Sequence, residues 1–172
     1  MCDDCVAVAN GLYPLHHPRQ RRLPMTTPDH ATTDPVAALI AEALRAAGHA
    51  HAPYSGWRVG AAAEFADQPG AVHRGANVEN GSYGLTICAE RTAIFAGVVA
   101  GARRLRRVAL VCRDRDGAAV PEIVPCGACL QVMTEFGGPD TEIVIEGAGT
   151  FRIRDFLPRP FGAGVTVPRA GT

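Results

Sequence analysis

The chain of 172 residues contains no lysine, so all 17 of its basic side chains are arginines. We attribute this absence to the composition of the genome and not to mechanism. Aspartate and glutamate together also number 17, which leaves no net formal charge. Proteins that hold a polyanion usually carry a basic excess or a basic stripe. The charge balance therefore argues against nucleic-acid binding as the main role.

Long apolar runs are missing as well. No stretch approaches the roughly 20 apolar residues that span a bilayer. The N-terminal stretch has no basic start followed by an apolar core, so it does not resemble a secretory signal. We therefore expect a cytoplasmic protein. Thiols stay reduced there, so the six cysteines indicate metal binding or catalysis and not disulfides.

The two ends differ from the middle of the chain. Residues 1–24 mix proline, arginine and histidine without periodicity, and we expect a disordered extension or an upstream start ahead of Met25. We assign residues 25–172 to a single domain and expect its last residues to fray. The extension contains four potential zinc ligands, but nothing around them builds a core that would hold them. These four are Cys2, Cys5, His16 and His17.

The hydrophobic pattern predicts helices and strands in alternation. Asp34 and Pro35 are typical of an N-cap and a first helical position, and apolar residues follow at helical spacing. The expected elements are a helix at 34–50, strands at 58–65 and 72–78, a helix at 88–101, a strand at 106–112, a helix at 126–136, a strand at 141–147 and a short or edge strand at 151–156. Strands separated by helices predict an α/β fold, in which helices cover both faces of a mixed sheet.

Two separated segments place cysteines where helices are expected to begin. Cys88 opens "CAERTAIFAGVVAG", and Cys126 and Cys129 open "CGACLQVMTEF". Two such helices can start side by side at the carboxyl ends of adjacent parallel strands. A helix N-terminus lowers the pKa of a thiol and so favours the thiolate that binds metal. Three thiolates from two helices predict a tetrahedral Zn²⁺ site with one open position, which is the catalytic pattern.

Glu90 lies two residues after Cys88. In the first turn of a helix this offset can aim a carboxylate past the metal towards its open position, where it can move protons between water and a substrate nitrogen. A lone glutamate at a helix start more often complements the helix dipole, but the three cysteines favour the catalytic interpretation. Arg91 can offset the negative charge of three thiolates by hydrogen bonding to sulfur; the alternative is a surface arginine.

Two other interpretations of the cysteines remain open at this point. Cys112 is a potential fourth ligand, but it lies in the apolar run "VALVC", where a free cysteine is usually a core residue. A structural zinc clasp would also use three or four cysteines, although it would leave Glu90 unexplained.

These motifs resemble a known family. Cys-x-Glu followed later by Pro-Cys-x-x-Cys is the signature of zinc-dependent cytosine and adenine deaminases in their three-cysteine form. The segments "PYSGWRVGAA", "NVENGSYGLTICAERTAIF", "VPCGACLQV" and "DFLPRPF" are similar, in this order, to the small homotetrameric cytidine deaminases over residues 52–161. The resemblance implies a three-layer α-β-α sandwich with a mixed five-stranded sheet, Zn²⁺ as cofactor, and a homotetramer with composite active sites.

The resemblance also implies a reaction. It is the hydrolytic deamination of cytidine and 2′-deoxycytidine to uridine and 2′-deoxyuridine, as in pyrimidine salvage, with attack at C4 of the base. Glu90 would protonate N3 and then pass a proton to the departing ammonia. The residues that the resemblance assigns to substrate binding are Trp57, Asn77, Glu79, Tyr83, Ala89, Pro125 and Phe161.

Each of these substrate contacts has an implied role. Asn77 and Glu79 would hold the ribose 3′-hydroxyl, and a carboxylate is well suited to accept from a sugar hydroxyl. The backbone at Ala89 and around Pro125 would contact the edge of the base. Tyr83 and Phe161 would reach the active site of a neighbouring subunit; the alternative for both is an ordinary packing aromatic.

The chain departs from the family pattern at two positions. Trp57 stands where the family usually has phenylalanine against the substrate, and the larger indole can stack harder or crowd the pocket. Leu130 stands where an arginine usually follows the second cysteine of Cys-x-x-Cys, which puts more weight on Arg91. Both changes leave the chemistry intact and leave the choice of substrate open.

Three further functions compete with this one. An aminonucleoside deaminase of the blasticidin S type, or a deaminase of modified cytidines, would share the metal and Glu90; the intact "NVEN" favours a plain nucleoside. A polynucleotide-editing deaminase would need a basic surface, and the cluster "RRLRR" at 103–107 is more typical of a solvated edge. A non-enzymatic zinc module would not need Glu90.

Overall fold

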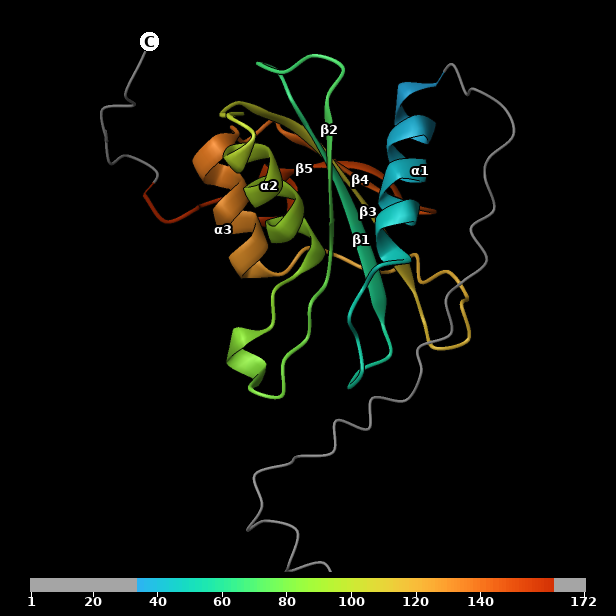
Figure 1. The fold of residues 1–172 in the computed structure, drawn as a ribbon. Helices are drawn as coiled ribbons and strands as arrows, with labels where there is room; N and C mark the ends of the chain where they lie inside the picture. Colours follow the sequence, from blue (N-terminus) through green and yellow to red (C-terminus); the bar gives the residue numbers. More distant parts are fainter. Residues whose placement is uncertain (1–33, 163–172) are drawn as a thin grey trace, which may run out of the picture.

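The computed structural model describes residues 34–162, in which helices cover both faces of one sheet (Figure 1). The elements in chain order are α1 (Pro35–Ala47), β1 (Arg58–Phe65), β2 (Val72–Ala76), the 3₁₀ helix η3 (Tyr83–Leu85), α2 (Ala89–Val99), β3 (Leu105–Arg113), α3 (Gly127–Phe136), β4 (Glu142–Ile145), β5 (Gly149–Arg152) and α4 (Ile153–Phe156). The sheet has the strand order β2-β1-β3-β4-β5. β3 and β4 are parallel and the other neighbours antiparallel. The predicted α/β sandwich with a mixed five-stranded sheet is confirmed.

The first helix covers one face of the sheet. Asp34 caps α1 by accepting a hydrogen bond from the amide of Val36 at 2.9 Å, and Pro35 starts the helix without losing a backbone bond. The apolar side of α1 packs on small residues of β1 and β3. These small residues let the backbones approach closely: a Cβ at Gly60 of β1 would lie 2.0 Å from the carbonyl oxygen of Ala43. The helix is therefore held tightly against the sheet.

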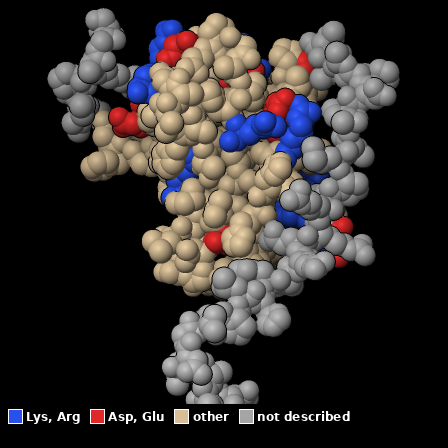
Figure 2. Space-filling model, viewed as in Figure 1, with Lys and Arg blue, Asp and Glu red and all other residues tan. Residues whose placement is uncertain are grey.

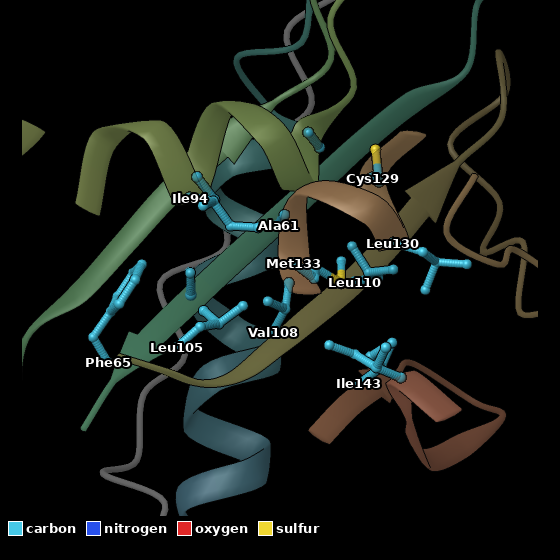
Figure 3. Close-up of a cluster of buried hydrophobic side chains, with 14 of the residues drawn as sticks. Ala61, Phe65, Ile94, Leu105, Val108, Leu110, Cys129, Leu130, Met133 and Ile143 are labelled. Carbon is cyan, nitrogen blue, oxygen red and sulfur yellow. The ribbon is translucent and has the colours of Figure 1, made fainter. Parts of the chain in front are cut away.

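The second face carries α2 and α3, which lie next to each other (Figure 1). Their inner sides pack on the sheet in the larger hydrophobic cluster (Figure 3). Large side chains in this cluster are essentially inaccessible to solvent: Phe65, Ile94, Leu110, Met133 and Ile143. Each contributes about 1.5–3 kcal/mol by leaving water. This core fixes the two helices relative to each other, and with them the residues at their N-termini.

A close backbone contact also fixes the start of α2. A Cβ at Gly75 of β2 would lie 2.2 Å from the amide nitrogen of Ala93 and 2.4 Å from the carbonyl oxygen of Ala89. Any other residue at this position would therefore push the first turns of α2 away from the sheet. Because Glu90 lies in the first of those turns, the glycine helps to set the depth at which its carboxyl group is buried.

The strand topology corrects one detail of the sequence analysis. We expected α2 and α3 to follow adjacent parallel strands. β2 and β3 do run in the same direction, because each is antiparallel to β1, but β1 lies between them. In the β1–β2 hairpin it is β1 that pairs with β3, so β1 separates β2 from β3. The two helices still begin on the side of the sheet where β2 and β3 have their carboxyl ends.

Several element boundaries also differ from the prediction. The segment 151–156 is not one strand, because the chain leaves β5 at Arg152 and turns into α4. Asp155 accepts a hydrogen bond from the amide of Arg152 at 2.7 Å, which starts that helical turn. β2 ends at Ala76, and Val78 makes isolated bridges to residues on both sides instead. The helix expected over 34–50 ends at Ala47.

No helix within residues 34–162 is long and apolar enough to cross a membrane. The expected extension over residues 1–24, its four potential ligands and the expected frayed segment after Gly162 lie outside the described residues.

Candidate metal centre and active site

Three cysteines converge where α2 and α3 begin. Cys88 is the N-cap of α2, Cys126 is the N-cap of α3, and Cys129 lies in the first turn of α3. The Sγ atom of Cys126 lies 3.8 Å from that of Cys88 and 3.4 Å from that of Cys129. All three sulfurs lie within 4.8 Å of one another. The predicted convergence of these cysteines is confirmed.

The spacing of the sulfurs fits a zinc ion. Zinc bonds to thiolate sulfur at about 2.3 Å in tetrahedral geometry, which places two ligand sulfurs about 3.8 Å apart. Neither N-cap cysteine uses its side chain to cap its own helix, so both sulfurs point their lone pairs elsewhere. The unpaired amide groups at two helix N-termini add positive potential, which favours thiolates. The donor set is therefore that of a zinc site with three protein ligands.

The electrostatics of the cluster decide which thiol ionises first. Hydrogen bonding from Cys129, supported by Arg91, lowers the pKa of Cys88 to about 5. The pKa of Cys129 is raised instead, because its proton is held in the hydrogen bond to Cys88 and because it is buried. The cluster thus favours the thiolate form at Cys88, the form that binds a metal ion.

Glu90 lies in the first turn of α2 beside this cluster. It is one of few charged residues in the interior of the described chain, with 4% of its surface exposed. Burial raises the pKa of its carboxyl group to about 7, and the charge of Cys88 adds to the effect. A carboxyl group that is partly protonated near neutral pH can both accept and donate a proton. The site therefore combines a metal-binding set with an acid–base group.

Arg91 carries positive charge to the sulfurs. Its Nη2 donates to Sγ of Cys88 at 3.5 Å and to the carbonyl oxygen of Thr86 at 3.2 Å. Its Nε is buried without a hydrogen-bond partner among the described residues. This geometry matches the charge-balancing role expected from the sequence. The guanidinium also ties the thiol cluster to Thr86, which lines the neighbouring cavity.

A cavity of about 390 Å³ is lined by Tyr54, Ser55, Glu79, Tyr83 and Thr86, and Arg91 connects it to the cysteines through its hydrogen bonds to Thr86 and Cys88. Glu79 is held by the turn opposite it: its Oε2 accepts from the amides of Tyr54 and Ser55 at 2.9 and 3.2 Å. Its Oε1 accepts from the hydroxyl of Ser55. Desolvation opposes ionisation of Glu79, but these hydrogen bonds outweigh it and lower the pKa of the carboxyl group. Glu79 is therefore a fixed carboxylate on the cavity wall.

The remaining residues expected to bind substrate occupy different surroundings. Ala89 and Pro125 are buried beside the cysteines to which they are bonded in sequence. Asn77 is 7% exposed, and its amide joins two backbone groups: Nδ2 donates to the carbonyl of Trp57 at 2.9 Å, and Oδ1 accepts from the amide of Val59 at 2.8 Å. The side chain of Asn77 thus fixes the segment that carries Trp57.

The three aromatic residues expected to contact substrate are exposed. Trp57 is 49% exposed and Tyr83 is 75% exposed, with its ring edge-on to that of Tyr54 at 6.0 Å. Phe161 is 89% exposed, and its backbone exchanges two hydrogen bonds with the side chain of Gln131 on α3. These rings present apolar surface to the outside of the chain.

The structure also shows the surroundings of Cys112 and of Leu130. Cys112 lies in β3 opposite Val59 and is buried, and it does not belong to the sulfur cluster. The core interpretation of Cys112 is therefore confirmed. Leu130 packs in the hydrophobic core with Met133 (Figure 3), so no positive side chain reaches the metal centre from that position.

Sequence reasoning missed Ser55 and Arg115, which hold the segment around Trp57 through side-chain hydrogen bonds. The motif "PYSGW" predicts a turn, and a serine in a turn can hydrogen-bond to nearby backbone groups.

This combination defines the class of protein: an α/β fold in which three cysteines that could hold a metal ion lie beside a buried carboxyl group. Residues 34–146 match the family model for the cytidine and deoxycytidylate deaminase zinc-binding region. The chain belongs to that family.

Characterised relatives agree with this assignment. The chain is 48% identical to the cytidine deaminase of Halalkalibacterium halodurans over 107 residues. These residues make up 62% of this chain and 76% of the relative. It is 44% identical to the cytidine deaminase of Mycobacterium tuberculosis over 125 residues, and this matched stretch makes up 72% of this chain and 87% of the relative. The crystal structure of the cytidine deaminase from Burkholderia pseudomallei superimposes with a TM-score of 0.64 at 44% identity, over 73% of this chain and 98% of that one.

Proposed function

We propose that this chain catalyses the hydrolytic deamination of cytidine and 2′-deoxycytidine to uridine and 2′-deoxyuridine, a reaction of pyrimidine salvage. The observation that carries this proposal is the buried carboxyl group of Glu90 beside three convergent thiols. The relatives at 44–48% identity are cytidine deaminases, which agrees with it.

Zinc is the cofactor, held by Cys88, Cys126 and Cys129. Bound there, it supplies Lewis-acid activation of a water molecule. The rest of the chemistry falls to the chain itself. Arg91 balances part of the thiolate charge through its hydrogen bond to Cys88.

Glu90 is the proton carrier. Its carboxyl oxygen takes a proton from the attacking water and delivers it to N3 of the pyrimidine. It then moves the second proton to the exocyclic nitrogen, which leaves as ammonia. Burial keeps bulk water away from the carboxyl group and raises its pKa to about 7, which suits both the uptake and the release of protons. The peptide groups at Ala89 and Pro125 contact the edge of the base.

The sugar lies in the cavity lined by Glu79. Its volume of about 390 Å³ is within the range of about 300–1,000 Å³ for small-molecule sites. A carboxylate can accept about four hydrogen bonds, and Glu79 accepts three from the turn, so it can also accept from the 3′-hydroxyl. Asn77 donates its second amide hydrogen to the same 3′-hydroxyl. It also holds the backbone of Trp57, whose indole covers the pyrimidine.

The active form is a homotetramer with composite sites. Tyr83 and Phe161 reach a neighbouring copy, which accounts for two aromatic side chains that are 75% and 89% exposed. α2 also presents apolar residues to the outside: Phe95 is 44% and Val99 is 89% exposed. Contiguous exposed apolar surface is typical of an interface, and a second copy is the partner that a composite active site requires.

The site of action is the cytoplasm, where zinc-binding cysteines remain reduced. We assign catalysis to residues 25–172 and expect residues 1–24 to be dispensable.

A substrate panel distinguishes this function from its competitors. Release of ammonia is measured with cytidine, 2′-deoxycytidine, cytosine, blasticidin S and a short single-stranded DNA. The proposed function predicts turnover of the two nucleosides. On the face shown in Figure 2, arginine side chains lie beside acidic ones, and the chain has no net formal charge, which disfavours DNA. Turnover of blasticidin S or DNA alone would overturn the proposal.

A further inference from the structure

The turn between α1 and β1 is held by two oppositely charged side chains from distant parts of the chain. Its amides at Tyr54 and Ser55 donate to the carboxylate of Glu79. The carbonyl oxygens of the same two residues accept from Arg115: Nη2 lies 2.8 Å from the oxygen of Tyr54, and Nε lies 3.1 Å from that of Ser55. One guanidinium thus spans two successive carbonyls, and one carboxylate spans the two corresponding amides.

The next residue of the turn is shaped to accommodate this arginine. Gly56 has a φ of +76°, a conformation that glycine adopts without strain. A Cβ at this position would lie 2.1 Å from Cγ and 2.4 Å from Nε of Arg115. The stem of Arg115 therefore lies directly over Gly56. The same glycine permits the backbone conformation and leaves room for the arginine.

Arg115 is itself carried by an ordered turn. Oδ1 of Asp114 accepts from the amides of Asp116 and Ala118 at 3.0 and 2.8 Å. Nη2 of Arg58 donates to the carbonyl of Asp114 at 3.3 Å, which ties this turn to the start of β1. The segment continues from β3 to the N-cap of α3. The connection that leads into the metal centre therefore also holds the turn that borders the cavity.

We propose that Arg115 is a positioning residue for the sugar half of the site, an inference that rests on the proposed function. By fixing the carbonyls of Tyr54 and Ser55, it fixes the amides that orient Glu79, and it fixes the backbone that carries Trp57. Arg115 touches no reacting atom in this arrangement. The larger part of its effect on substrate passes through Glu79, so the loss should be greater for a substrate that has a 3′-hydroxyl.

The planar fork of Arg115 is what the geometry requires. A lysine ammonium keeps the charge but is a point donor, so it does not hold two successive carbonyls in a fixed geometry. Because Arg115 is exposed, the loss on removal should be modest. We expect about a three- to tenfold increase in KM for cytidine in Arg115→Ala, as for the loss of one or two hydrogen bonds. The kcat should change less, because binding of ground state and transition state is weakened alike.

The experiment compares three variants of the full chain with zinc bound. These are Arg115→Ala, Arg115→Lys and Arg106→Ala, the last being a matched control at an exposed arginine on β3. Each is assayed for kcat and KM with cytidine and with 3′-deoxycytidine. A second readout does not need activity: Trp57 is the single tryptophan of the chain, so acrylamide quenching of intrinsic fluorescence reports on the held turn.

The expected result is a higher KM for cytidine in Arg115→Ala, a smaller increase for 3′-deoxycytidine, and stronger quenching of Trp57. Arg115→Lys should fall in between, and Arg106→Ala should match the wild type. Equal losses on both substrates, or unchanged KM and quenching, would overturn the proposal. If Arg115→Ala does not fold, Arg115→Lys decides by the same criteria. A wild type that does not deaminate cytidine would overturn the proposed function, while the quenching data would still decide whether Arg115 holds the turn.

Discussion

The sulfur atoms of Cys88 and Cys126 lie 3.8 Å apart although 38 residues separate them in the chain. Each residue is the N-cap of its helix, and neither side chain caps that helix. An N-cap side chain normally accepts a hydrogen bond from the first turn, a contribution of about 1 kcal/mol. Two helices that give up this bond at the same place do so because their caps have another partner.

We propose that this partner is zinc, and metal content is the first prediction. The purified protein should contain one zinc per chain. Cys129→Ala should lose or weaken it, because two remaining thiolates no longer hold the tetrahedral ion. The measurement is elemental analysis after gel filtration.

Cys112→Ala is the matched control, since Cys112 is a buried thiol in β3 outside the cluster; it should keep full zinc content. Full zinc content in a triple variant of Cys88, Cys126 and Cys129 would reject this site and direct attention to the cysteines and histidines of residues 1–24.

The second prediction concerns Glu90. Glu90→Gln should retain zinc and fold but lose about a hundred- to ten-thousand-fold in kcat, because the amide cannot carry a proton. Steady-state ammonia release and zinc analysis measure both quantities on one preparation. Glu135→Gln changes an exposed glutamate of α3 and should leave both unchanged. Near-normal turnover in Glu90→Gln would remove this residue from the mechanism.

The third prediction concerns the charge around the thiolates. Arg91→Gln removes the guanidinium that donates to Cys88, so turnover should fall. The acid limb of the pH–rate profile should move to higher pH, because a less compensated negative centre holds protons more tightly. Arg91→Lys keeps the charge and should recover part of the loss. A profile and rate identical to the wild type would argue that Arg91 is merely structural.

Some of this site could be predicted because its signals are local. Cys88 and Glu90 share one helical turn, and the Cys-x-x-Cys spacing brings Cys126 and Cys129 together at the first turn of another helix. Helix starts are readable from caps and periodicity. The α/β class followed from the alternation of strands and helices. The order of strands did not, because β1 pairs on both edges and no local pattern encodes the partner of a strand.

The cavity wall could not be predicted from spacing, because its contacts are long-range. Glu79 accepts a hydrogen bond from the amide of Tyr54, 25 positions away in the sequence. Arg115 donates to the carbonyl of Tyr54, 61 positions away. Each is a polar side chain with an unremarkable local sequence. Asn77 is a similar case: the family resemblance implies a sugar contact, and the structure adds that its amide joins the backbones of Trp57 and Val59.

The fourth prediction concerns assembly. If Tyr83 and Phe161 complete the site of a neighbouring copy, the active species is a tetramer. Val99→Asp adds a charge to the exposed apolar side of α2 and should weaken association together with activity. Multi-angle light scattering paired with an activity assay on the same fractions measures both, and Arg106→Asp serves as a control on an exposed position of β3. A fully active monomer would contradict the composite site.

The last prediction concerns Trp57, whose indole is half-exposed and whose amide donates to the hydroxyl of Ser55, a residue of the cavity wall. An indole offers more stacking area than a phenyl ring, worth about 0.5–1.5 kcal/mol where the geometry permits. It also takes more room, and overpacking a tight pocket costs about 1–3 kcal/mol. The two effects are similar in size for cytidine itself, so Trp57→Phe should keep cytidine deamination.

Substituted pyrimidines separate the two effects, because a substituent on the covered face or edge adds to the crowding but not to the stacking. Trp57→Phe should therefore raise kcat/KM for ring-substituted cytidines relative to cytidine, and the ratio should rise with substituent size. Asn77 and Ser55 hold the backbone of Trp57 in both proteins, so the difference isolates the ring. A ratio that stays constant across a series of 5-substituted cytidines would mean that Trp57 is a packing residue and that another part of the wall selects the base.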